Sequence, residues 1–342
     1  MAEVTPQHIL QTGMGFMASK TLLSAVELGL FTRLGDRALT GAQLCGELGL
    51  SPRANPDFFD ALLALGFLAR DGEGAGARYR ASSEAAAFLD KAKPGYIGGI
   101  LEMADARLYR FWGDLSEALK TGAPQNEIKH TGRPMFEELY ADEARLAQFI
   151  EAMAAISAGN VAALAQKYDF SRYKSLCDVG GASGLLSIRV AQRHPHMTCV
   201  SIDLPKVTPI AQRAIAAAGL AERVSAASLD IFSAPLPKVD VITMGHILHD
   251  WNLEKKKQLI KAAYQALNPG GAFIIIENVI DDARRENAFG LLMSLNMLIE
   301  FGDAFDFTAA DFFSWCAEVG FAPGEVIPLA GPASAAVAYK PG

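Results

Sequence analysis

The pattern of hydrophobic and polar positions changes near Tyr173. From there on, short apolar runs alternate with segments whose apolar residues recur every three or four positions, the pattern of strands alternating with helices. Such alternation predicts an α/β fold with a doubly wound, mainly parallel sheet. The predicted strands are 175–179, 198–203, 224–227, 239–244 and 272–277, and the predicted helices are 185–193, 208–217, 255–267 and 309–319.

The C-terminal tail departs from this alternation. Two apolar runs, Glu325–Leu329 and Ala335–Tyr339, are joined by a short connection, which predicts an antiparallel hairpin. Pro269-Gly270-Gly271 predicts a sharp turn just before the fifth strand. A parallel sheet closed by a C-terminal hairpin fits a methyltransferase better than a dehydrogenase, whose sheet would continue with parallel units.

The chain before Tyr173 is predicted to be mainly helical. Residues 7–34 are too apolar on all sides to stand alone in water, so a partner subunit is expected to cover them. A helix opened by Leu39-Thr-Gly-Ala-Gln-Leu44 and capped by Thr40, a helix at 56–65 and a hairpin at 67–80 then form a winged-helix arrangement. Further helices are predicted at 100–119, 136–140 and 143–168.

Composition and charge exclude several classes of protein. The 342 residues carry a net charge of -7, and the would-be recognition helix of the winged helix bears Asp57 and Asp60, so a nucleic-acid partner is not expected. Four cysteines without CxxC spacing indicate reduced core residues of a cytoplasmic protein. The chain shows no secretory leader pattern and no apolar run of about 18 residues, so no membrane span is expected.

A glycine cluster between the first two predicted strands indicates a nucleotide-cofactor site. Asp178-Val-Gly180-Gly181-Ala-Ser-Gly184 ends one strand and opens a helix, and Asp203 ends the next strand. An acid at this place can accept hydrogen bonds from both ribose hydroxyls. The spacing is not the dinucleotide G-x-G-x-x-G, and an acid beside the loop disfavours a pyrophosphate. The same acid suits a cationic ligand such as S-adenosylmethionine.

Several further motifs, in order along the chain, resemble those of the small-molecule O-methyltransferases of the caffeate and acetylserotonin type. The resemblance covers nearly the whole chain. It implies a Rossmann-like class I methyltransferase sheet, a winged-helix dimerisation domain over 1–98, and a helical substrate wall with the methyltransferase domain over 99–342. The motifs are Asp178–Gly184 (family DVGGGTG), Asp203–Pro205 (FDLP), Leu229–Phe232 (GDMF), Ile247–Trp251 (ILHDW), Asn268–Gly271 before a strand ending in Glu277, and Phe149–Met153 (FxxxM).

The resemblance also implies roles for single residues. His249 corresponds to the general base, and Glu277 and Asp306 to the acids that orient it. The acceptor, a small molecule, would lie against Phe149, Met153, His246, Asp250 and Met297. The S-adenosylmethionine site would comprise Asp178, Gly180, Gly181, Gly184, Asp203, Leu204, Asp230, Ile231, Phe232 and Gly245.

The chemistry of methyl transfer to oxygen agrees with these roles. A phenol titrates near 10, so only about one molecule in a thousand is ionised at pH 7. A histidine that removes this proton as the methyl group moves typically contributes about 10²–10⁴-fold. A second reading keeps methyl transfer but changes the acceptor atom to sulfur, nitrogen or carbon. A third is a relative that binds the cofactor without methylating.

The chain departs from the family pattern at several positions. Gly245 and His246 stand where the family has lysine and tryptophan, so the lysine contact with the cofactor is absent or made by backbone. His246 is read either as a second pocket base or as a packing group. Asp306, shorter than the usual acid, is expected to reach His249 less well, and Ala182, in place of a glycine, to tighten the loop. Leu253 replaces the usual acid after the histidine motif.

Overall fold

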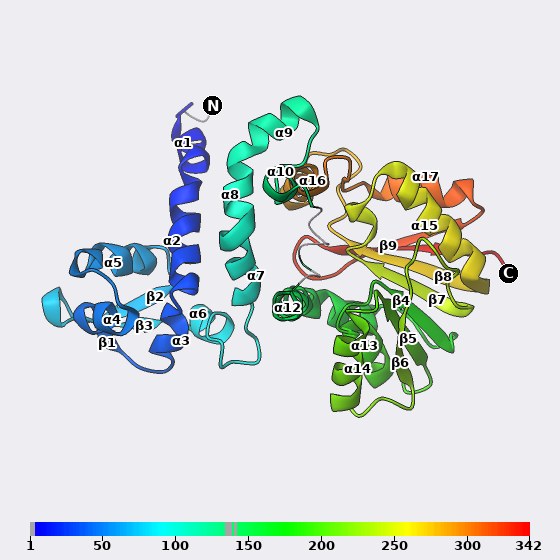
Figure 1. Cartoon of the computed structure of the whole chain (residues 1–342), viewed down its shortest axis with the longest axis horizontal. Coiled ribbons are helices and arrows are strands. Elements are labelled where there is room, and N and C mark those ends of the chain that lie inside the picture. The colour runs from blue at the N-terminus through cyan, green and yellow to red at the C-terminus, as the bar shows by residue number, and fades with distance from the viewer. Residues whose placement is uncertain (1–3, 134–138, 140–141) are drawn as a thin grey trace. The chain divides into compact units, whose positions relative to one another are not determined.

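The structure is a computed structural model that describes residues 4–133, 139 and 142–342. The chain divides into two compact units, Met1–Arg110 and Phe111–Gly342 (Figure 1). The domain boundary predicted at residue 98 falls inside the first unit. Of the helix predicted at 136–140, only Leu139 lies within the described residues.

The first unit contains a winged-helix arrangement, with one strand that the sequence pattern did not indicate. Leu39 and Thr40 form a short strand that pairs with the hairpin, so the next helix begins only at Gly41. Thr40 caps that helix through a reciprocal capping box with Gln43, as predicted. The sheet order is β1-β3-β2. The elements are β1 (Leu39–Thr40), α4 (Gly41–Leu48), α5 (Asp57–Ala64), β2 (Leu68–Asp71), β3 (Arg78–Ala81), α6 (Ser83–Phe88) and α7 (Gly98–Met103).

The predicted helix over residues 7–34 is three helices. Breaks at Met14 and at Gly29, which adopts a positive φ of 70°, separate α1 (Gln7–Gly13), α2 (Gly15–Glu27) and α3 (Leu30–Leu34). The C-terminal part packs into the core of the unit, where Leu30 and Phe31 are buried. The N-terminal part does not: Ile9 is 73% exposed and Phe16 is 52% exposed. The apolar surface that the sequence assigns to a partner is therefore confined to α1 and the first turns of α2.

The second unit is built on a seven-stranded sheet with the order β6-β5-β4-β7-β8-β10-β9 (Figure 1). The first five strands of this order are parallel, and β10 pairs antiparallel with both β8 and β9. The predicted parallel sheet with a terminal antiparallel hairpin is thus confirmed. The strands are β4 (Ser175–Val179), β5 (Thr198–Asp203), β6 (Val224–Ser228), β7 (Val239–Gly245), β8 (Leu267–Glu277), β9 (Ala322–Pro328) and β10 (Ser334–Tyr339).

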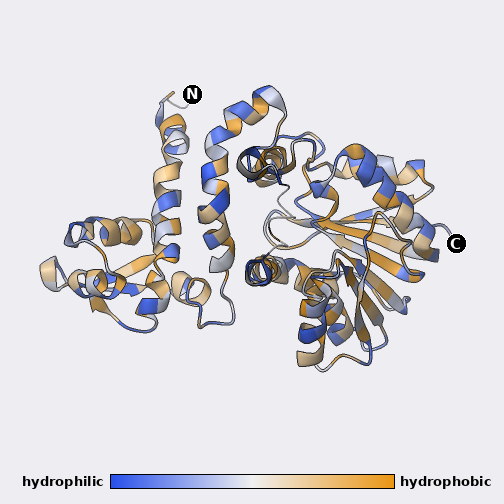
Figure 2. Cartoon of the chain, viewed as in Figure 1, coloured by the Kyte–Doolittle hydropathy of each residue, from blue (hydrophilic) through white to orange (hydrophobic). Residues whose placement is uncertain are grey.

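Successive residues of the central strands face two different cores, which is why these strands are apolar almost throughout (Figure 2). Leu176 packs with the core on one face, while Cys177 packs with the core on the other. The first face is covered by α12 (Glu143–Lys167), α13 (Leu185–Arg193) and α14 (Thr208–Ala217), and the second by α15 (Leu253–Ala266) and α17 (Ala309–Glu318).

Three further features of the chain differ from the sequence-based predictions. The Pro269-Gly270-Gly271 segment is not a turn before the strand, since β8 runs through it from Leu267 with an irregular register against β7. The predicted helix at 100–119 is interrupted by a π-helical turn at Ala104–Leu108 and a 3₁₀ turn at Trp112–Asp114 before α9 (Leu115–Thr121). An unpredicted helix, α16 (Ala288–Phe301), follows β8.

One helix of the described chain, over Arg145–Lys167, is long and apolar enough by composition to cross a membrane. This segment is part of α12, and its Val161, Leu164 and Ala165 side chains are buried against the sheet. A core helix of a globular domain meets the same criteria of length and composition. Packing against the sheet thus accounts for the apolar residues in the C-terminal part of α12.

Candidate active site

The glycine loop between β4 and α13 leaves no room for side chains at two of its positions. Gly180 has a φ of 67°, and a Cβ atom there would collide with the Ile247 side chain. A Cβ atom on Gly181 would collide with Ser201 Oγ and lie 2.8 Å from Asp178 Oδ2. The loop backbone is therefore held close to β5 and to the 3₁₀ turn that follows β7, and only glycine permits this approach.

Asp178 lies buried beneath this loop. Its Oδ1 atom accepts a hydrogen bond of 2.7 Å from Thr243 Oγ1 on β7. Burial raises the pKa of Asp178 to about 7, although the hydrogen bond from Thr243 opposes the shift. A carboxylate in such surroundings gains strongly from a nearby cation.

Asp203 ties the end of β5 to the glycine loop. Its Oδ2 atom accepts from the backbone N–H of Ala182 at 2.9 Å, and its Oδ1 atom accepts from the backbone N–H of Leu204 at 2.7 Å. Ala182, at the position of a family glycine, adopts a positive φ of 48°. Burial raises the pKa of Asp203, and the two backbone hydrogen bonds oppose this shift. Each carboxylate oxygen keeps a second lone pair for a ligand.

The segment after β6 presents an acid and two apolar side chains. Asp230 is exposed, and its Oδ1 atom accepts from the backbone N–H of Phe232 at 3.0 Å. Ile231 and Phe232 are half-buried. The Phe232 ring meets Trp251 edge-on, with 4.7 Å between centroids, and Lys255 Nζ lies 4.4 Å from the Trp251 ring centroid. Ile231 and Phe232 thus form an apolar surface beside the hydrogen-bond acceptor Asp230.

His249 lies in the 3₁₀ turn Leu248–Asp250 that follows β7, and it is buried among carboxylates. Its Nδ1 atom lies 3.4 Å from Asp306 Oδ1 and 3.8 Å from Glu277 Oε2. Its Nε2 atom lies 3.3 Å from Asp250 Oδ1. Asp306 comes closer to the imidazole than Glu277 does, but neither Asp306 oxygen forms a hydrogen bond in the described structure, and the expectation that its short side chain reaches His249 less well than a longer acid stays a prediction.

Glu277 holds this turn in place through its other oxygen. The Oε1 atom accepts from the backbone N–H groups of Leu248 at 3.1 Å and of His249 at 3.4 Å. Its Oε2 atom faces the imidazoles of His249 and His246. The carboxyl end of β8 therefore fixes the backbone of this turn and places a carboxylate oxygen next to the His249 ring.

The buried charges shift the pKa values of this group in opposite directions. Burial by itself lowers the pKa of His249, but Glu277, Asp250 and Asp306 together outweigh it and raise this pKa to about 10. Burial likewise favours a raised pKa for Glu277, yet the neighbouring imidazoles lower it. Burial raises the pKa of Asp250 to about 6, against the opposing influence of His249. The imidazole thus holds a proton more tightly than a free histidine does.

The comparisons with known proteins agree with this geometry. Residues 112–322 match the family model described as an O-methyltransferase domain, and residues 10–91 match the O-methyltransferase dimerisation domain. The first match spans more than half of the chain. The chain belongs to the O-methyltransferase family.

Relatives of this O-methyltransferase align over almost their full length. The tetracenomycin polyketide synthesis 8-O-methyl transferase TcmO of Streptomyces glaucescens is 40% identical, over 98% of this chain and 97% of the relative. The N,N-dimethyltransferase OxyT of Streptomyces rimosus is 33% identical, over 92% and 90%. The 3-hydroxy-5-methyl-1-naphthoate 3-O-methyltransferase of Streptomyces sahachiroi is 32% identical, over 96% and 92%.

A solved structure shows the same fold. Human N-acetylserotonin methyltransferase in complex with SAM superposes with a TM-score of 0.91 at 26% identity, and the match covers 100% of this chain and 99% of that one. The chain is therefore an S-adenosylmethionine-dependent O-methyltransferase that acts on small-molecule acceptors. The family resemblance, the methyltransferase fold and the cofactor predicted from the sequence are confirmed.

The residues at the carboxyl edge of the sheet suit S-adenosylmethionine. Buried Asp178 complements a cation beside the glycine loop, and Asp203 has acceptor capacity for two ribose hydroxyls. The half-buried Ile231 and Phe232 offer apolar contact for an adenine ring, with Asp230 as acceptor beside them. The Gly245 position offers backbone only, since it has no side chain.

The predicted walls of the acceptor pocket come from α12 and from the unpredicted helix α16. Phe149 on α12 and Ala182 of the glycine loop both pack against one small buried cluster that includes Ile150 and Val207. Met153 on α12 is half-buried, and Met297 on α16 is buried. α16 packs against the 3₁₀ turn that carries His249 and Asp250. These side chains stay candidates for acceptor contact.

Sequence reasoning missed Lys256 as part of this charge group. Its side chain is fully buried, its ammonium donates to the carbonyl of Trp251, and it lies 3.8 Å from the Phe305 ring centroid. Burial lowers the pKa of Lys256 to about 8, while Glu277 and Asp306 oppose the shift. The Glu254-Lys-Lys-Lys257 run suggests a solvent-facing helix turn, so the sequence carries no signal for this burial.

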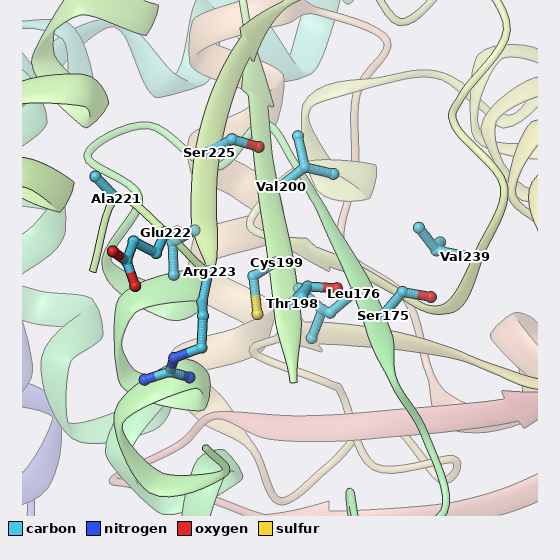
Figure 3. Close-up of a pocket in the computed structure, with 11 residues that line it drawn as sticks. Ser175, Leu176, Thr198, Cys199, Val200, Ala221, Glu222, Arg223, Ser225 and Val239 are labelled. Atoms are coloured by element: carbon cyan, nitrogen blue, oxygen red, sulfur yellow. The ribbon is translucent and has the colours of Figure 1, made fainter. Parts of the chain in front are cut away.

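A separate surface depression lies at the other edge of the sheet (Figure 3). Its volume is about 270 Å³, and it is lined by the amino ends of β4, β5, β6 and β7, with Glu222 and Arg223 beside it. Arg223 donates to the carbonyl of Ala191 at 2.8 Å, which is a structural role. The depression lies at the amino ends of these strands, away from the glycine loop and from His249 at their carboxyl ends.

Proposed function

We propose that His249 is the general base that takes the proton of the acceptor hydroxyl. The observation that carries this proposal is the position of the buried imidazole, whose Nδ1 atom lies 3.4 Å from Asp306 Oδ1 and 3.8 Å from Glu277 Oε2 while Nε2 lies on the side of Asp250. The carboxylates on the Nδ1 side stabilise the imidazolium that forms when Nε2 accepts a proton. When bound, S-adenosylmethionine supplies an electrophilic methyl group. Asp203 and the glycine loop would hold it at the carboxyl edge of the sheet.

We further propose that the acceptor is a phenolic hydroxyl on a fused-ring aromatic compound. Two relatives support this class, since their names give a polyketide and a naphthoate as substrates of O-methylation. The raised pKa of His249, about 10, equals the ordinary pKa of a phenol, so proton transfer between them has little thermodynamic cost. The N,N-dimethyltransferase relative favours a second candidate, an amine acceptor on the same scaffold.

The pH dependence of methyl transfer to a hydroxynaphthoate tests the base and the acceptor together. Because the raised pKa keeps His249 protonated at neutral pH, kcat/KM is expected to rise with pH, close to tenfold per unit between about pH 7 and 9. Asp306→Asn removes one of the charges that raise this pKa, so the ascending limb should move to lower pH. Labelled S-adenosylmethionine provides the measurement. A flat profile, or transfer to an aminonaphthoate alone, would contradict the proposal.

We infer that the chain forms a homodimer through its dimerisation domain. The exposed apolar side chains of α1 and α2 support this, because monomeric proteins rarely leave such a patch in water. The relevant side chains, all more than 45% exposed, are Ile9, Leu10, Met14, Phe16 and Met17.

The double variant Ile9→Glu/Phe16→Glu is expected to convert the dimer into a monomer. Each of these side chains contributes about 1.5–3 kcal/mol when buried, so the dimer dissociation constant should rise by about 10²–10⁴-fold. Light scattering after size exclusion measures the mass. Leu253→Glu, at an exposed apolar position of α15, is the control and should leave the dimer intact. A double variant that remains dimeric at micromolar concentration would place the interface elsewhere.

We also infer a cytoplasmic protein without a nucleic-acid partner. All four cysteines are buried free thiols, which supports a reducing compartment. On α5, Asp57 pairs with Arg53 and Asp60 pairs with Arg70, so these acids sit where a groove-reading helix would need unpaired cations.

A further inference from the structure

The histidine that replaces the family tryptophan joins a cluster of potential metal ligands. One donor atom from each of His246, His249 and Glu277 lies within 4.8 Å of the other two. His246 follows β7 directly, and its Nδ1 atom lies 3.5 Å from Glu277 Oε2. Its backbone adopts a positive φ of 54°, a strained conformation for a residue with a side chain. The chain thus holds a second imidazole against the same carboxylate.

Buried polar atoms in this cluster lack hydrogen-bond partners. Among the described residues, His249 Nδ1, Glu277 Oε2 and both carboxylate oxygens of Asp306 are buried without a partner. His249 is 8% exposed, Glu277 1% and Asp306 2%. Unsatisfied buried groups are rare and each destabilises the protein, so their convergence on one point indicates a missing ligand. The Glu277 Oε1 atom, in contrast, is engaged by two backbone N–H groups.

The separations of these atoms match the ligand polyhedron of zinc. Nitrogen and oxygen ligands about 2.0–2.1 Å from a tetrahedral zinc ion lie about 3.3–3.4 Å from one another. Here Glu277 Oε2 lies 3.5 Å from His246 Nδ1 and 3.8 Å from His249 Nδ1, and Asp306 Oδ1 lies 3.4 Å from His249 Nδ1. The donors of His246, His249 and Glu277 therefore converge on one point, and Asp306 lies beside the His249 member of this set.

We propose that His246, His249 and Glu277, with Asp306 beside His249 Nδ1, form an inhibitory site for a divalent transition-metal ion of the zinc type. Imidazole nitrogens and carboxylate oxygens are suitable donors for such ions. The ion would occupy the Nδ1 side of His249 and draw the carboxylates away from it. With its Nδ1 lone pair bound to the ion, the neutral imidazole would carry its ring hydrogen on Nε2, so it would have no lone pair there to accept the acceptor's proton. This inhibitory consequence rests on the proposed role of His249 as base, whereas metal binding itself does not.

Binding is tested with Co²⁺ as a spectroscopic probe of the full-length, chelator-treated protein. We expect visible d–d absorption that saturates at one ion per chain and disappears when Zn²⁺ is added. His246→Ala removes one ligand and should weaken binding roughly tenfold or more. His196→Ala is the control. The His196 ring packs against His194 and contacts the Phe170 carbonyl, outside the proposed ligand set, so this variant should leave the titration unchanged. No absorption with wild type, or equal absorption with His246→Ala, would overturn the site.

Inhibition is tested in the same preparations with a phenolic acceptor. Zn²⁺ at the concentration that displaces Co²⁺ should abolish transfer, and a chelator should restore it. In His246→Ala the Zn²⁺ concentration for half-inhibition should rise by the same factor as the binding constant. If the site is saturated with metal and methyl transfer continues, the proposal that the ion inhibits the enzyme is overturned, and the role of His249 as base is also contradicted. If the enzyme is active but binds no metal ion, the metal site is overturned and the proposed function stands.

Discussion

His249→Ala is expected to lower kcat for a phenolic acceptor by about 10²–10⁴-fold near pH 9, the range that a positioned general base contributes. At that pH most of a phenolic acceptor still carries its proton, while His249 has begun to lose its own, so the substitution removes the group placed to take the acceptor's proton. Affinity for S-adenosylhomocysteine should change little, because the cofactor-binding residues assigned at β4, β5 and β6 do not contact His249. Single-turnover transfer of a labelled methyl group measures the first quantity, and calorimetry measures the second.

A matched variant separates the base from the integrity of the pocket. His249→Gln keeps a polar side chain of similar length but cannot take a proton, so it should be as slow as the alanine variant. The control His194→Ala removes a histidine whose Nε2 atom contacts the Ala165 carbonyl at 2.8 Å, on the α12 face of the sheet, and should retain activity. If His249→Ala keeps more than a tenth of wild-type kcat with a phenol, His249 is not the base. If the His249→Ala variant stays active only with an amine acceptor, this result would instead favour amines as the acceptor class.

The parallel sheet was predictable because its signals are local. Predicted and observed bounds coincide for β4, β5, α13 and α14, where short apolar runs end in glycine or acid and helices carry one apolar face. The predictions were less accurate for the short strand β1 and for the start of β8. β1 has two residues and exists only because β3 pairs with it, and β8 continues through Pro269 since Asn268 anchors to Asp240.

α16 shows why long-range pairing defeats sequence reasoning. It is apolar around nearly its whole circumference, so it has no amphipathic period to detect. Two of its polar residues have hydrogen-bond partners more than 150 positions away. Asn296 accepts from Trp112 Nε1 at 3.0 Å, and Asn126 donates to the backbone carbonyl of Glu300 at 2.7 Å. The position of Met297 beside the candidate site follows from these contacts.

The candidate site was predictable as a set of residue types but not as an arrangement of charges. The motif around His249 and the acids Glu277 and Asp306 came from family resemblance, and the structure brings all three together. Which of the two acids lies closer to His249 could not be predicted from the sequence, because this depends on the path of the loop between α16 and α17. Burial of Lys256 and the turn of His246 toward Glu277 are likewise tertiary effects without a local pattern.

Asp203→Ala is expected to weaken S-adenosylhomocysteine binding by about 10²–10⁴-fold. Two hydrogen bonds from ribose hydroxyls to a carboxylate are each worth about 1.5–3 kcal/mol. The substitution also removes the acceptor for the Ala182 N–H group at 2.9 Å, so the glycine loop loses its tie to β5 and the site is no longer preorganised. Isothermal titration calorimetry measures the affinity, and thermal unfolding checks that the variant folds.

Graded variants distinguish the ribose contact from loss of the loop. Asp203→Asn keeps one oxygen that can accept from Ala182 but removes the charge, so its affinity should fall between wild type and alanine. Asp230→Ala removes a single acceptor at an exposed position and should cost less than Asp203→Ala. Asp169→Ala, whose exposed carboxylate accepts only from Ser171 nearby, should bind as wild type. A folded Asp203→Ala protein that binds within threefold of wild type would show that another residue holds the ribose.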